Sequence, residues 1–174
     1  MENQPVPAKK IMLNYGLYLG IVSIIISVAV YAMGMHYEQD WKNMVIGIIV
    51  MFVIIFLGIK KYKEFNSGYL TIGQALKTGI GIALIGGIIG VIYSYIFMNF
   101  IEPDFMDKMM ELQQQKMIED YPQLSDEQIE MQIEMMNKFS TPLISSAFQI
   151  IGSLFFGFVI SLIVGFIQKN DPKK

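Results

Sequence analysis

Cysteine and arginine are absent from this 174-residue chain, and histidine occurs once, at His36. Without cysteine the chain can form no disulfide, no thiolate metal site and no cysteine nucleophile. A single histidine cannot by itself supply a histidine metal site or a Ser-His-Asp triad. All 13 basic residues are lysine, so bidentate recognition by arginine is excluded too. We therefore expect no enzyme activity, no cofactor and no metal site.

Charge is also scarce: 16% of the residues are charged, 53% are hydrophobic, and the mean hydropathy is +0.47. A helix needs about 20 mostly apolar residues to cross the hydrocarbon core of a bilayer. Four segments meet this requirement, at about residues 11–35, 42–59, 72–100 and 143–167. This pattern predicts an all-α fold, an integral membrane four-helix bundle in which residues 1–174 form a single membrane domain.

The first apolar segment follows Lys9 and Lys10, as the apolar region of a secretory signal peptide would. Its uncharged run, Ile11–Met35, is longer than such a region. We expect it to remain in the protein as a membrane span.

Residues 101–139 differ from the segments around them because they are polar and acidic. Pro103 is expected at the first position of a helix, and Asp120-Tyr121-Pro122 is expected to end that helix. Ser125 followed by Gln128 has the form of a capping box, which predicts the start of a second helix. The sequence thus predicts an extracytoplasmic helical hairpin between the third and fourth spans.

The distribution of charge predicts the orientation of the bundle. The N-terminal tail, the 60–77 region and the C-terminal tail contain nine lysines and three acidic residues, a net charge of +6. The 36–43 loop and residues 101–139 contain four lysines and twelve acidic residues, a net charge of −8. Lysine-rich segments remain in the cytoplasm. We expect both termini to be cytoplasmic and residues 101–139 to be extracytoplasmic, which would be the periplasm in a bacterium with two membranes.

Small residues recur every three or four positions in the third and fourth spans, a pattern that allows helices to approach closely in lipid. We predict that these residues form helix–helix contacts. The stripe in the third span is Gly79, Ala83, Gly87, Gly90 and Ser94, and it is expected to face the stripe in the fourth span, which is Ser153, Gly157, Ser161 and Gly165. Gly86 and Gly90 also form a GxxxG pair, which is typical of close helix–helix contact.

The start of the third span contains more polar and small residues than a membrane helix requires. Thr71 followed by Gln74 predicts a capping box, and Lys77 can extend from the first turns to the headgroups. With Gly68 and Gly73, these residues form a candidate interface site on the cytosolic side.

Seven of the 14 methionines lie in residues 101–139, among acidic neighbours. Thioethers bind Cu(I), so a copper site is one interpretation. The alternative, which we favour, is that these methionines fill the hairpin core or contact a partner, because their side chains adapt to irregular surfaces. The acidic residues lack the spacing of an EF-hand loop and are expected to form a solvated face.

Two stretches resemble a known family. They are NSGYLTIGQALKTG at Asn66–Gly79 and IYSYIFMNFIEPDF at Ile92–Phe105. The chain resembles, over nearly its whole length, a domain-of-unknown-function family of small four-helix bacterial inner-membrane proteins. The resemblance implies a location and a topology. It implies no activity and no site residues.

The function that these patterns favour is that of a structural or interaction protein, which presents the acidic, methionine-rich hairpin to a protein partner or to a second copy of the chain. The alternative is an accessory subunit of a transporter or channel. Asp, Glu, Arg and His are absent from the four apolar cores, which argues against proton-coupled transport by the chain itself. The lipid bilayer is an expected partner. Nucleic acid is not, because the chain has no basic surface with interleaved aromatic residues.

Overall fold

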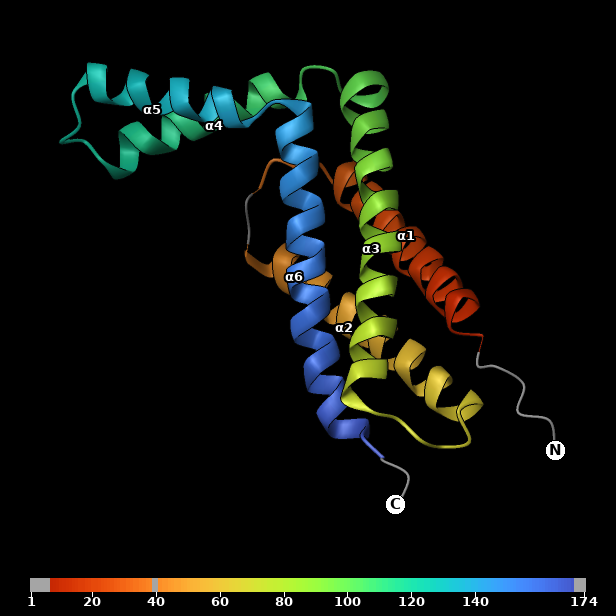
Figure 1. Cartoon of the computed structure of the whole chain (residues 1–174). Helices are drawn as coiled ribbons and strands as arrows, with labels where there is room; N and C mark the ends of the chain where they lie inside the picture. The colour runs from red at the N-terminus through yellow and green to blue at the C-terminus, as the bar shows by residue number, and fades with distance from the viewer. Residues whose placement is uncertain (1–6, 39–40, 171–174) are drawn as a thin grey trace. The chain divides into compact units, whose positions relative to one another are not determined.

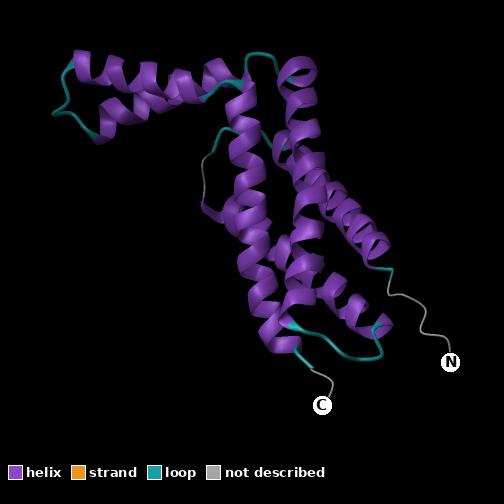
Figure 2. Ribbon diagram, viewed as in Figure 1, coloured by secondary structure: helices purple, strands orange, loops and turns teal. Residues whose placement is uncertain are grey.

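Figure 1 traces the chain in a computed structural model, which describes residues 7–38 and 41–170. Within these residues, four helices are long and apolar enough to cross a membrane: α1 (Ala8–Ala32), α2 (Trp41–Phe65), α3 (Ile72–Ile96) and α6 (Pro142–Gln168). α3 continues as a π-helical turn, η1 (Phe97–Ile101). The described residues contain no β-strand beyond one isolated bridge (Figure 2). The predicted all-α class and the four apolar helices are confirmed.

Large apolar side chains cover the outside of these helices. Ile25 on α1 is 62% exposed, Ile49 on α2 is 56% exposed, and Leu143 on α6 is 82% exposed. Each Å² of apolar surface left in water costs about 25 cal/mol. A surface of this composition is suited to contact with lipid hydrocarbon, which is as apolar as the side chains themselves.

α2 extends beyond its predicted apolar span. The span was expected to end at residue 59, but the helix continues through Lys60, Lys61 and Lys63 to Phe65. Lysine is a good helix former, and its long side chain can reach water from a helix that leaves the apolar layer. Lys63 in the last turn also interacts favourably with the negative end of the helix dipole. The lysines after residue 59 end the apolar run of α2, but they do not end the helix.

Two further helices, α4 (Phe105–Asp120) and α5 (Asp126–Phe139), contact each other and lie side by side in Figure 1. The predicted capping box of α5 is present: Gln128 N–H donates to Ser125 Oγ (3.3 Å), and Ser125 N–H donates to Gln128 Oε1 (3.0 Å). The predicted start of α4 at Pro103 was wrong. The helix begins two residues later, because Phe105 N–H bonds to the carbonyl of Glu102 and closes a turn first (3.1 Å).

The chain divides into two compact units. The first comprises Met1–Gly90 with Ile150–Lys174, and the second comprises Val91–Gln149. The largest fully buried apolar side chains all belong to the first unit and come from α2, the α2–α3 loop, α3 and α6. They are Ile55, Ile59, Leu70, Ile82 and Val164. The core of the first unit therefore unites helices that are far apart in sequence.

Candidate functional site

The candidate site lies in the first unit, where α2 ends and α3 begins. α2 ends at a turn in which Ser67 and Gly68 adopt φ angles of 53° and 82°. Left-handed angles of this kind favour glycine, and Gly68 N–H bonds to the carbonyl of Lys63 (2.9 Å), which satisfies one of the last helix carbonyls. The Asn66 side chain donates to the carbonyl of Tyr69 and stabilises the same turn (2.8 Å).

The segment that follows this turn is bound to the end of α6. Leu70 and Asn170 form an isolated antiparallel bridge, with N–H···O distances of 2.9 and 3.0 Å. The Asn170 side chain also donates to the carbonyl of Gly68 (2.8 Å). Leu70 is fully buried. These contacts join segments about 100 residues apart and fix the α2–α3 loop against the C-terminal end of the bundle.

α3 begins with the predicted capping box. Thr71 N–H donates to Gln74 Oε1 (2.9 Å), and Gln74 N–H donates to Thr71 Oγ1 (3.3 Å). One turn later the buried hydroxyl of Thr78 donates to the carbonyl of Gln74 (2.8 Å). Thr71 and Gln74 therefore use these polar groups within the helix start, as a structural cap does.

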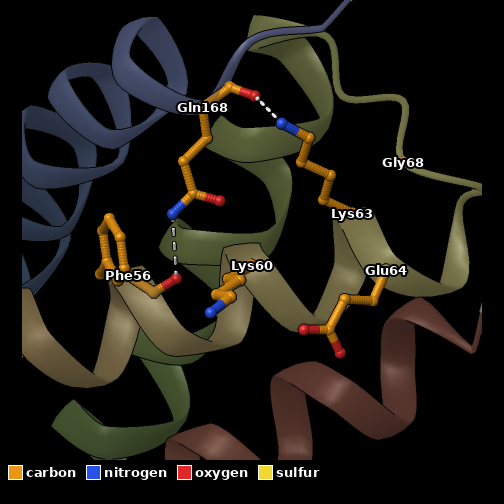
Figure 3. A pocket seen from close by; sticks show the side chains of 6 residues that line it. All are labelled: Phe56, Lys60, Lys63, Glu64, Gly68 and Gln168. Atoms are coloured by element: carbon orange, nitrogen blue, oxygen red, sulfur yellow. Dashed lines mark hydrogen bonds between the residues drawn. The ribbon is translucent and has the colours of Figure 1, made fainter.

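A hollow with a volume of about 390 Å³ lies between the C-terminal ends of α2 and α6. We call it the α2–α6 hollow, and Figure 3 shows its lining residues. They are Phe56, Lys60, Lys63, Glu64, Gly68 and Gln168.

Two hydrogen bonds cross from α2 to α6 beside this hollow. Lys63 Nζ donates to the carbonyl of Gln168 (2.7 Å), and Gln168 Nε2 donates to the carbonyl of Phe56 (3.4 Å) (Figure 3). Gln168 is 9% exposed, so both its backbone and its buried side chain connect the two helices. The first bond also satisfies a carbonyl at the end of α6 that has no partner within the helix.

The five residues of the predicted interface site do not converge on one pocket. Gly68 lines the α2–α6 hollow, and Thr71 and Gln74 form the helix cap. Gly73 and Lys77 are exposed on α3 and do not line the hollow. Phe56, Lys60, Lys63, Glu64 and Gln168 were not predicted as site residues. The run of lysines at the end of α2 was a visible signal, but the position of Gln168 depends on the tertiary fold.

The small residues of α3 and α6 lie against one another in an antiparallel series. A Cβ placed on Gly79 would collide with Ser161, one on Gly157 would collide with Ala83, and one on Gly87 would lie 2.8 Å from Ser153 Oγ. The Ser153 hydroxyl donates to the carbonyl of Ala83 across the interface (2.7 Å). Close approach of the backbones thus permits both van der Waals contact and an interhelical hydrogen bond.

The remaining small residues have different neighbours. A Cβ on Gly165 would lie 3.1 Å from Cβ of Ala75 on α3, which continues the same series. Gly86 instead faces Leu19 of α1, whose Cγ would lie 2.8 Å from an added Cβ. Gly90 is half-buried, and in the second unit Ser94 donates to Gln149 Oε1 (3.4 Å).

α1 contacts α3 through a second close interface, and here the two helices run parallel. A Cβ on Gly81 would lie 2.9 Å from Met12 Cγ, one on Gly16 would lie 2.5 Å from Ile85 Cβ, and one on Gly20 would lie 2.8 Å from Ile89 Cβ. α3 therefore packs against α1 and α6 through glycines on different faces.

Residues 7–38 and 41–170 contain no group of three or more His, Asp or Glu side chains placed to hold a metal ion.

A family model described as "Protein of unknown function (DUF4199)" matches residues 14–170. No curated protein and no solved structure matches the chain. The matched range includes the described helices from α2 to α6 and all of α1 except its first turns.

Proposed function

Because the chain belongs to DUF4199, a family of unknown function, we propose its role from its own geometry: a non-enzymatic protein of the bacterial inner membrane that presents α4 and α5 to a protein partner. The first unit would anchor the protein in the bilayer through apolar helices. The α4–α5 segment would lie outside the membrane on the extracytoplasmic side, with both termini in the cytoplasm.

Charge supports this orientation. Residues 101–139 carry ten acidic residues and three lysines, whereas the lysine-rich end of α2 joins the α2–α3 loop at the opposite end of the predicted spans. The asymmetry of lysine between the two sides favours a cytoplasmic location for the α2–α3 loop. Glu2, Asp40, Asp171, Lys173 and Lys174, which enter the full count of charges, lie outside the described residues.

The observation that carries the proposal is a second apolar stripe on α5. One face of this helix buries Ile129, which is 7% exposed. Met131, Met135 and Phe139 recur every four residues on another face and are 61%, 56% and 56% exposed. The α4–α5 pair does not need this stripe for its own core. Methionine and aromatic side chains are enriched where proteins meet partners.

We expect partner capture to depend on this stripe. A photo-crosslinker at Gln132, between the two exposed methionines, should trap a partner in native membranes. Met131→Gln combined with Met135→Gln should reduce the trapped yield about tenfold, because losing two buried methionine contacts at an interface costs about 1–2 kcal/mol in total. Quantitative mass spectrometry of the crosslinked product measures the change.

The matched control is Met33→Gln, since Met33 is 62% exposed but lies at the end of α1. This variant should trap the partner as well as the unaltered chain does. An equal loss of trapped partner in the control and in the double variant would contradict the proposal. So would the absence of any trapped partner with the unaltered chain. If capture depends on the stripe and the trapped protein is a transport protein, the result would favour the role of an accessory subunit.

A further inference from the structure

The α2–α6 hollow has the composition of a site for an amphipathic anion. Four of its lining residues come from one face of α2, because positions 56, 60, 63 and 64 recur at helical spacing. Phe56 is nearest the apolar part of the helix, and Lys60 and Lys63 follow one and two turns later. An apolar ring followed by two ammonium groups matches a molecule whose acyl chain continues into a phosphate headgroup.

Cationic groups remain available at the mouth of the hollow. Lys60 is exposed, and its side-chain ammonium group has no hydrogen-bond or ion-pair partner among the described residues. Lys63 gives one hydrogen bond to the carbonyl of Gln168, and an ammonium group has three donors. Both lysines can therefore bind an anion without breaking a contact of the fold.

The negative groups around the hollow are partly neutralised. Glu64 also lines it, but its Oε2 accepts a hydrogen bond from Lys61 Nζ at 3.0 Å. In Figure 3 the side chains of Lys63 and Glu64 leave α2 in different directions. The C-terminal carbonyls of α2 and α6 also disfavour an anion here, and Lys63 offsets this at α6 through its bond to Gln168. Lys60 is then the cation on which anion binding depends.

We propose that the α2–α6 hollow binds the phosphate headgroup of an anionic phospholipid, with Lys60 and Lys63 contacting the phosphate and Phe56 contacting the start of an acyl chain. The hollow lies where the apolar run of α2 gives way to lysines, which is the level of the headgroups in a bilayer. A lipid at this place would also contact Gln168, which joins α2 to α6. Its binding should stabilise the contact between these helices.

The test uses the full chain purified in a neutral detergent at low ionic strength. Phosphatidylglycerol, phosphatidylcholine and inorganic phosphate are titrated separately, and native mass spectrometry counts the bound molecules. Phosphatidylglycerol should bind at one saturable site. Lys60→Gln should weaken this binding about fivefold, since one lysine near an anionic lipid contributes that much.

The matched control is Lys77→Gln, because Lys77 is an exposed lysine of α3 that does not line the hollow. Its affinity for phosphatidylglycerol should stay within about twofold of the unaltered chain. Lys63→Gln provides a second variant and should also weaken binding. Equal binding of phosphatidylcholine, or equal losses in Lys60→Gln and Lys77→Gln, would overturn the site. Saturation by inorganic phosphate at the same concentrations as phosphatidylglycerol would show that a free phosphate, and not a lipid, is the ligand.

Discussion

Gly79→Ala should lower the melting temperature of the purified chain by about 4–8 °C relative to Gly73→Ala, which corresponds to about 2 kcal/mol of overpacking. The added methyl group at Gly79 would collide with Ser161 Oγ, and it would lie 2.8 Å from Ser161 Cβ and 3.0 Å from Ile55 Cγ2. The hydroxyl can rotate away, but the Cβ atom is fixed to its helix. α3 and α6 would have to separate.

Gly73→Ala is the matched control, because a Cβ at Gly73 would meet no atom within 4 Å. Gly79 lies in the interior of α3 and gains about 1 kcal/mol of helix propensity on substitution by Ala, whereas Gly73, in the first turn, gains less. The difference between their melting temperatures is therefore a lower bound on the cost of the collision. Ser161→Gly combined with Gly79→Ala should recover part of the loss, since it removes the opposing Cβ. Equal melting temperatures for the two single variants would show that α3 and α6 do not approach closely at this position.

Gly16→Ala should lower the melting temperature by a similar amount, because it overpacks the other interface of α3, the one with α1. The new methyl group would lie 2.5 Å from Ile85 Cβ, 2.7 Å from Ile85 Cγ2 and 3.2 Å from the carbonyl oxygen of Ile82. Isoleucine is branched at Cβ and has little freedom to turn aside. Relief requires a shift of the α1 backbone, at a cost of about 1–3 kcal/mol.

The control for this prediction is Gly47→Ala on α2, where an added Cβ would meet nothing within 4 Å. Thermal unfolding in detergent should place Gly16→Ala about 3–8 °C below Gly47→Ala. A Gly16→Ala variant as stable as the control would mean that α1 does not contact α3 through this face.

Local patterns in the sequence predicted the helices and their caps well. Runs of uncharged residues indicate membrane spans because the bilayer imposes their length. The capping boxes at Thr71 and Ser125 involve residues three positions apart, so they depend only on the chain near each helix start.

The partners of the small residues were harder to predict. Spacing indicates that glycines share a helix face, but it does not say which helix they face. Gly86 and Gly87 are neighbours, yet Gly86 lies against α1 and Gly87 against α6, because successive residues point about 100° apart on a helix. The spacing placed Gly87 in the stripe expected to face the fourth span and Gly86 in a GxxxG pair, and it indicated no partner helix for Gly86.

The α2–α6 hollow depends entirely on tertiary structure. Lys63 and Gln168 are 105 positions apart, and Leu70 meets Asn170 only because α3 starts where α6 ends. The sequence placed polar residues near this level of the membrane but contained no pattern that paired them. The predicted interface site therefore included Lys77, which does not line the hollow, and did not include Lys60, which does.

The proposed topology places α4 and α5 on the opposite side of the membrane from the α2–α3 loop. The chain has no cysteine, so an introduced cysteine is its only thiol. Gln123→Cys, between α4 and α5, and Ser67→Cys, after α2, are exposed positions suited to labelling with a membrane-impermeant maleimide in spheroplasts. Gln123→Cys should react with intact spheroplasts, and Ser67→Cys should react only after the membrane is permeabilised. Labelling of both positions before permeabilisation, or the reverse pattern, would contradict the proposed topology.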